Sequence, residues 1–326
     1  MLKVETMKKY LFIFCLLFLI GCDDENKVGR EIAQIPMGLT ITRFDEIFAK
    51  AELKDLPQLK KDYALFFPKQ VPDSIWEQRF SDTIQRQLNQ EVAKVFPDDT
   101  SLEETIRPLF QHFKYYFPRF KSPVIYTVTS DVDYQNKVIA ADSLMVISLD
   151  NYLGADHYFY EGISSFISRN LNPSQLGPDI ANVYARQLSS PPKNRTFLAL
   201  MIYYGKALYL ADLVTPSSSD AEKIGYTEDQ MFWAKDNEIY MWRYFIEKEL
   251  LYSTDEELPA RFLNPAPFSK FYLEIDNDSP GGLGRYMGWQ VVRSYMERNP
   301  EVTIEELLKK PADEIYIKSN YKPKKN

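Results

Sequence analysis

The side chains that could perform chemistry are few in this sequence of 326 residues. It contains two histidines, His112 and His157, and two cysteines, Cys15 and Cys22. A peptidase-type zinc site needs two histidines four residues apart on one helix face with a glutamate as the base, and this pair cannot supply that H-E-x-x-H motif. A serine–histidine–aspartate triad through His157 has no G-x-S-x-G elbow to support it. The residues alone therefore indicate no common metal or nucleophile site.

Carboxylates and one glycine-rich loop are the remaining candidates. The chain holds 46 Asp and Glu residues, too many for the sequence to single out a catalytic pair such as glycoside hydrolases use. The loop DNDSPGGLGR, from Asp276 to Arg285, precedes an expected helix from Tyr286 to Arg298. The amino terminus of a helix after such a loop can bind an anion. The loop lacks both the G-x-G-x-x-G and the GK[ST] spacing, so it does not indicate nucleotide binding.

The amino terminus carries the clearest motif. Lys8 and Lys9 precede an apolar run of 11 residues that ends in Leu19-Ile20-Gly21-Cys22. This pattern is typical of a secretory signal peptide with a lipobox, and the alternative, a signal anchor, needs a longer run to span a bilayer. We expect residues 1–21 to be removed and Cys22 to be acylated, which would anchor the protein to a lipid bilayer effectively permanently.

Cysteine use and net charge restrict the function further. With Cys15 removed and Cys22 acylated, no thiol would remain for a disulfide, a nucleophile or a zinc–thiolate site. The acidic residues 23–25 are either a solvated tether or a sorting signal to the cell surface. We expect a location in the cell envelope, at the outer membrane, on either face. The formal net charge of −7 argues against a nucleic-acid partner.

Composition and hydrophobic spacing predict a mainly helical protein with a small β-sheet. Glycine is scarce, with 12 residues, whereas the chain has 21 Phe and 22 Tyr, which favours helices and aromatic packing. Three short β-rich runs predict a three-stranded sheet: residues 124–129, 138–141 and 144–149. Residues 22–40 are polar and predict a lipidated tether. Residues 41–326 predict one domain, with a helical part over 41–120 and a sheet and core-helix part over 121–326.

One segment, Phe197 to Asp212, is nearly apolar on every face, which predicts a buried core helix. A membrane span is the alternative, but Arg195, Lys206 and Asp212 bound the segment too tightly for one. Lys206 is the exception in this helix. A buried ammonium costs several kcal/mol unless it is paired, so Lys206 must reach either water or a carboxylate.

The segment order of a short sheet, a core helix and a Gly-Arg loop before a Gly-Trp helix resembles the gliding motility lipoprotein family GldB of the Bacteroidetes. The similarity covers most of residues 40–326. The segments that carry it are Ile202–Asp212, Gly225–Glu238, Trp242–Ser253, Pro267–Met296 and Lys318–Lys324.

The resemblance implies an α+β, zincin-like fold of the gluzincin kind in which the metal site is degraded. It places Gly205 and Tyr209 at the two histidine positions, Lys206 at the glutamate and Glu238 at a third ligand, with Arg285 in the same region. Glycine offers no donor atom, an ammonium repels Zn²⁺ and a phenol is a poor ligand at neutral pH. The resemblance therefore implies no cofactor and no bound metal.

The same resemblance implies a role in gliding motility, through binding other envelope proteins of the motility and secretion machinery. The chain would then be a protein without catalytic activity, in which Lys206 and Glu238 form an ion pair that fills the former metal site. Two alternatives stay open. One is an active envelope hydrolase that uses carboxylates in the same cleft, and the other is an aromatic core with no ancestral site.

Overall fold

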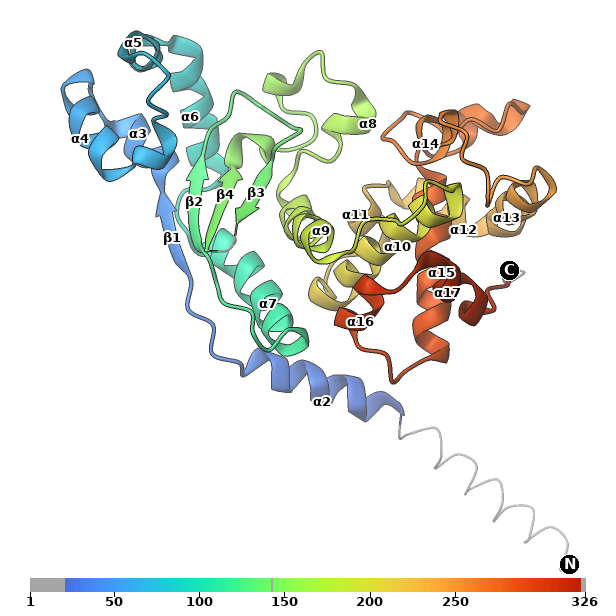
Figure 1. The fold of residues 1–326 in the computed structure, drawn as a ribbon. Coiled ribbons are helices and arrows are strands. Elements are labelled where there is room, and N and C mark those ends of the chain that lie inside the picture. Colours follow the sequence, from blue (N-terminus) through green and yellow to red (C-terminus); the bar gives the residue numbers. More distant parts are fainter. Residues whose placement is uncertain (1–20, 142, 324–326) are drawn as a thin grey trace, which may run out of the picture.

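The structure is a computed structural model that describes residues 21–141 and 143–323. Residues 1–20, which make up nearly all of the expected signal peptide, lie outside the described residues. Figure 1 shows a small sheet with α3 to α6 on one side of the molecule and a group of helices, α8 to α17, on the other. The expected mainly helical fold with a small sheet is confirmed.

The first third of the described chain consists of helices and one strand. Its helices are α2 (Gly21–Ala33), α3 (Phe44–Lys50), α4 (Leu56–Asp62), α5 (Asp73–Ser81), α6 (Thr83–Val95) and α7 (Thr100–Tyr116), with short 3-10 helices η1 (Leu53–Asp55) and η2 (Ala64–Phe66).

Helix α2 occupies the segment for which the sequence predicted a tether. Its Ile32 is only 2% exposed, and the side chain of Gln111 on α7 donates hydrogen bonds to the carbonyls of Ala33, at 3.0 Å, and Ile35, at 2.9 Å. The segment predicted as a tether thus contains a helix, docked on α7 by one apolar side chain and two main-chain carbonyls.

The sheet has four strands in the order β1-β2-β4-β3: β1 (Thr40–Arg43), β2 (Val124–Val128), β3 (Val138–Ala141) and β4 (Leu144–Ser148). Strands β1, β2 and β4 are parallel, and β3 is antiparallel to β4. The three predicted strands are confirmed. Strand β1 was missed because its sequence TITR has a single large apolar residue, and it becomes a strand by pairing with β2.

The helical body follows the sheet. Its helices are α8 (Ser165–Ser168), α9 (Leu176–Leu188), α10 (Phe197–Val214), α11 (Asp220–Ile224), α12 (Glu228–Asp236), α13 (Glu238–Glu247), α14 (Glu257–Phe262), α15 (Leu283–Arg298), α16 (Ile304–Lys309) and α17 (Ala312–Ser319). Short 3-10 helices join them: η3 (Leu149–Asn151), η4 (Tyr158–Tyr160), η5 (Pro173–Gln175) and η6 (Glu274–Asp278).

Helix α10 is the centre of this body, as the sequence predicted. Thr196 caps it, since its hydroxyl accepts a hydrogen bond from the amide of Ala199 at 3.3 Å. Within residues 21–141 and 143–323, α10 is the one helix long and apolar enough to cross a membrane by length and composition. Its residues are mostly buried against α7, α9, α15 and α17, so α10 is a core helix.

Candidate functional site

The crossing of α10 and α15 lies where the resemblance places the first metal ligand. Gly205 of α10 faces Gly288 of α15 so closely that a Cβ at Gly205 would lie 2.3 Å from the Gly288 carbonyl oxygen. A Cβ at Gly288 would lie 1.9 Å from the carbonyl oxygen of Met201. Real Cβ atoms do not approach that closely, so both positions require glycine. Close helix packing thus explains Gly205 without reference to a lost ligand.

Lys206 is buried, at 4% exposure, but its partners differ from the expected one. Its Nζ donates to the carbonyl oxygens of Leu308, at 3.2 Å, and Lys310, at 2.6 Å, at the carboxyl end of α16. In the described part of the chain, no carboxylate lies within 4.0 Å of this ammonium. Burial lowers the pKa of Lys206 to about 8. The end of a helix suits a cation, because unpaired carbonyls and the helix dipole both favour positive charge there.

The expected ion pair between Lys206 and Glu238 is therefore absent, and that prediction was wrong. Glu238, the first residue of α13, accepts hydrogen bonds from the hydroxyls of Tyr286, at 2.7 Å, and Tyr321, at 2.6 Å. Burial, and then the Glu238 carboxylate, raise the pKa of both tyrosines above their usual range. Both phenols therefore stay protonated as donors, and Glu238 has two neutral partners in place of a cation.

Tyr209, at the second histidine position, is partly buried on α10. Burial, and then the nearby carboxylate of Asp212, raise the pKa of its phenol. A phenol that holds its proton is not a metal ligand at neutral pH.

The remaining site residue, Arg285, stands in the first turn of α15. Its Nε donates a hydrogen bond to the carbonyl of Leu263, and its guanidinium lies 4.6 Å from the ring of Tyr204. Arg285 lines a separate cavity at this end of the helix. The structure therefore brings Gly205, Lys206 and Tyr209 together on α10, with Glu238 and Arg285 in other surroundings.

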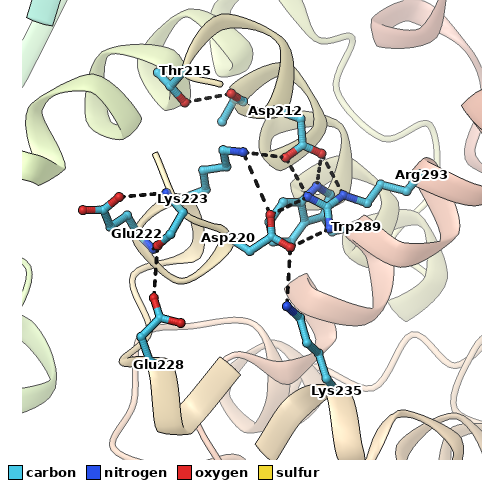
Figure 2. A network of polar contacts seen from close by, with 11 residues as sticks. Asp212, Thr215, Asp220, Glu222, Lys223, Glu228, Lys235, Trp289 and Arg293 are labelled. Atoms are coloured by element: carbon cyan, nitrogen blue, oxygen red, sulfur yellow. Dashed lines mark hydrogen bonds and ion pairs between the residues drawn. The ribbon is translucent and has the colours of Figure 1, made fainter. Parts of the chain in front are cut away.

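A network of charges that the sequence did not point to lies farther along the same two helices (Figure 2). Arg293 of α15 binds Asp212 of α10 through Nη2, at 2.7 Å, and Nε, at 2.8 Å. It also binds Asp220 of α11 through Nη2, at 2.8 Å, and Nη1, at 2.9 Å. The indole of Trp289 donates to Asp212 at 2.9 Å and lies under the Arg293 guanidinium, 3.7 Å from it.

Lysines complete this network. Lys223 lies 3.2 Å from Asp212 and 3.9 Å from Asp220, and Lys235 lies 3.9 Å from Asp220. The hydrogen bond from Arg293 is the main reason why the pKa of Asp220 falls below its usual range. Both carboxylates are thus paired with cations, an arrangement that joins α10, α11, α12 and α15 and leaves neither acid free as a general base. Sequence alone offered only acidic residues near helix ends, which are common.

The histidines and carboxylates of the described chain do not form a metal site. Among residues 21–141 and 143–323, no three His, Cys, Asp or Glu side chains gather as ligands. His112 contacts the carbonyl of Pro108 in its own helix, with 2.8 Å between Nδ1 and the oxygen. His157 caps η4 and lies 3.4 Å from Glu91. Each histidine is therefore engaged locally.

Comparison with models of protein families finds a match. The model of a lipoprotein family, described as "Gliding motility protein GldB", matches residues 25–323. No curated protein and no solved structure matches the chain.

Proposed function

This chain belongs to the gliding motility protein GldB family, and from that premise we propose that it is a non-catalytic binding component of the envelope machinery that drives gliding. The family ties the chain to gliding motility and to a lipid-anchored place in the envelope. Its partners would be other envelope proteins of the motility and secretion machinery.

The observation that carries the absence of catalysis is the helix crossing at Gly205 and Gly288. A histidine at either place would drive a side chain into the main chain of the neighbouring helix. Lys206 and Glu238 are likewise satisfied by groups of this chain, through two carbonyls and two phenols. We propose that the fold is zincin-like and that these contacts fill what would be the metal site in a peptidase of that fold.

The anchor in this proposal is an acylated Cys22 at the outer membrane. Helix α2 includes Cys22 and is docked on α7 through Ile32 and Gln111. Such docking would hold the body of the protein close to the bilayer. Replacement of Cys22 by Ser should abolish labelling with radioactive palmitate, and it should abolish gliding if the anchor is needed. Normal labelling of the Cys22→Ser chain would refute the anchor.

The catalytic question is tested by complementation. A gliding strain that lacks this protein is supplied with the Glu238→Gln chain, in which the amide oxygen still accepts a hydrogen bond but the charge is lost. We expect full colony spreading, because Glu238 serves as an acceptor for two phenols. A hydrolase that used this carboxylate would lose activity, so loss of spreading at normal protein level would favour the alternative of an envelope hydrolase.

A further inference from the structure

A cavity with about 100 Å³ of water-accessible space opens beside the amino terminus of α15. Two arginines, Arg169 and Arg285, line it together with the side-chain amides of Asn170 and Asn264 and the main chain of Gly282. Among the residues that the structure describes, no Asp or Glu lines it. The cavity therefore carries two positive charges and several neutral polar groups, with no negative charge of its own.

Arg285 enters this cavity with most of its donors unused. Its Nε is bound to the carbonyl of Leu263 and its flat face lies on Tyr204. In the part of the chain that the structure describes, neither Nη1 nor Nη2 has a hydrogen-bond partner, and no carboxylate lies within 4.0 Å. Burial, together with the charge of Arg186, lowers the pKa of this guanidinium. Arg285 is partly buried and has no counter-charge, and a guanidinium in that position is costly, so binding of an anion would stabilise it.

Arg169, which also lines the cavity, has neutral partners. Its Nε donates to the carbonyl of Ser165 at 3.2 Å, and its Nη1 donates to the amide oxygen of Gln230 at 2.7 Å. Among the described residues no carboxylate pairs with it, and burial lowers its pKa as well. These hydrogen bonds fix the direction of the side chain and leave its charge uncompensated.

The backbone adds to the positive potential. Gly282 precedes α15, a helix of 16 residues, with a φ of 72° and offers no side chain to cap it. The amide of Leu283 donates to the hydroxyl of Ser269 at 3.2 Å, and the amide of Arg285 donates to the carbonyl of Gly282 at 2.9 Å. The helix dipole still points its positive end toward the cavity. Gly281 must also be a glycine, since a Cβ there would lie 2.0 Å from the carbonyl oxygen of Ala266. Helix amino termini carry a partial positive charge and attract anions, and here that charge adds to the two guanidinium groups.

We propose that this cavity binds an anionic oxygen group, a carboxylate or a phosphate, held between Arg285 and Arg169 at the amino terminus of α15. The planar fork of arginine matches the oxygens of either group. The inference rests on the proposed binding function for its biological meaning, because it names the chemistry of what is bound. It concerns a place that none of Gly205, Lys206, Tyr209 or Glu238 lines.

The test is calorimetric titration of the full lipid-anchored chain, purified in detergent in a chloride buffer. The probes are sodium phosphate, N-acetyl-trialanine with a free carboxylate, and the same peptide as its amide. We expect phosphate or the free peptide to bind and the amide to fail. Arg285→Gln and Arg169→Gln should each weaken binding at least tenfold. The control, Arg261→Gln, should bind within twofold of the wild type, because Arg261 also bonds a carbonyl and stacks on a ring but does not line the cavity.

The probes separate the two sources of the anion. Binding of phosphate alone indicates a free phosphate, and binding of the peptide carboxylate indicates an acidic or terminal group of a protein partner. The two arginine variants lie on different elements, so circular dichroism of each shows which remains folded, and Arg285→Lys retains a charge if Arg285→Gln unfolds. Failure of every probe to bind the wild type, or equal binding by the folded arginine variants, would overturn the proposal. Gliding is not measured here, so this failure is distinct from failure of the proposed function.

Discussion

Helix α15 carries the same kind of side chain, an arginine, in opposite electrostatic surroundings at its amino terminus and in its second half. Burial alone would lower the pKa of Arg293, but the hydrogen bonds and charges of Asp220 and Asp212 raise it above its usual range. Burial lowers the pKa of Arg285, eight residues earlier and about 12 Å away along the helix, and no carboxylate counters that effect. The fold thus compensates the guanidinium of Arg293 and leaves that of Arg285, at the amino terminus of the helix, uncompensated.

Lys206 is an intermediate case between these two. It is more buried than either arginine and meets main-chain carbonyls in place of a carboxylate. Dipoles at a helix end stabilise a cation less than an ionised partner does, and the pKa of Lys206 falls to about 8. A buried cation in this protein thus has a structural role where the chain supplies its partner, and we infer a binding site where the chain does not.

We expect the largest effect from a change at the crossing of α10 and α15, which holds α15 in place. Replacing Gly288 by Ala forces a methyl group against the main chain of α10, where the Met201 oxygen lies 1.9 Å from the new Cβ position. We expect a loss of about 3 kcal/mol or more in the free energy of unfolding, measured by urea denaturation.

Gly29→Ala is the matched control for this change. Gly29 lies in α2 with nothing within 4 Å of a Cβ, so alanine should stabilise the chain by up to about 1 kcal/mol through helix propensity. A Gly288→Ala chain as stable as the wild type would show that the helices are not held in this close crossing.

We expect the next largest effect from removal of the compensated arginine, Arg293. Arg293→Met removes the arginine that binds both Asp212 and Asp220. We expect a loss of about 2–3 kcal/mol at pH 7, since the group is partly exposed and less costly to break than a fully buried pair. Arg298→Met, on the exposed last turn of the same helix, should change stability by less than about 0.5 kcal/mol. Equal effects of the two substitutions would contradict the structural role of the network.

This loss should depend on pH. The folded pKa of Asp220 lies below its ordinary value near 3.9, so its contribution is present above that value and is lost as the pH falls through the folded pKa. The stability difference between the wild type and Arg293→Met should therefore shrink between pH 5 and pH 3. A stability difference that stays constant over this interval would mean that Arg293 does not lower the pKa of Asp220.

A smaller effect concerns Lys206. Its folded pKa of about 8 lies below the unfolded value near 10.4, so the unfolded chain binds more protons in the interval between them, and stability rises with pH there. We expect the wild type to gain up to about 2 kcal/mol relative to Lys206→Met between pH 8 and pH 9.5. Parallel stability curves for the two proteins would refute the lowered pKa.

A double-mutant cycle tests the partner of Lys206 directly. Because Lys206 and Glu238 have separate partners, the effects of Lys206→Met and Glu238→Gln should add within about 0.5 kcal/mol. A larger coupling energy would indicate that Lys206 and Glu238 do form the predicted ion pair.

The smallest expected effect is that of the uncompensated arginine. In a chloride buffer without phosphate, Arg285→Met should lie within about 1 kcal/mol of the wild type, because relief of a desolvated charge offsets the lost hydrogen bond and ring contact. Urea denaturation of Arg285→Met and Arg293→Met in the same buffer compares their free energies of unfolding. A loss as large as that of Arg293→Met would mean that Arg285 is compensated within the chain.

Much of the fold was predictable because its signals are local. The apolar segment from Phe197 predicts α10, and the β-rich runs predict β2, β3 and β4, since burial on all faces or on one face leaves a pattern in neighbouring residues. Strand β1 and the docking of α2 were not predictable in this way. They depend on partners in β2 and α7 that lie far along the chain.

The candidate sites show the same limit. The sequence indicated that Lys206 needs a partner and that the loop before α15 could bind an anion, because both are properties of a few adjacent residues. It did not show that the partner is the end of α16, 102 residues away, or that Arg169 joins Arg285 in one cavity. Tertiary packing decides which carbonyl oxygen binds Lys206 and which second arginine lies near Arg285.

The most direct test of the account compares two variants in one gliding strain that lacks this protein. Glu238→Gln changes the place that corresponds to a peptidase ligand, and Arg285→Gln changes the anion cavity. At equal protein levels, shown by immunoblotting, the account predicts normal colony spreading for Glu238→Gln and loss of spreading for Arg285→Gln. Loss of spreading with Glu238→Gln and normal spreading with Arg285→Gln would contradict it.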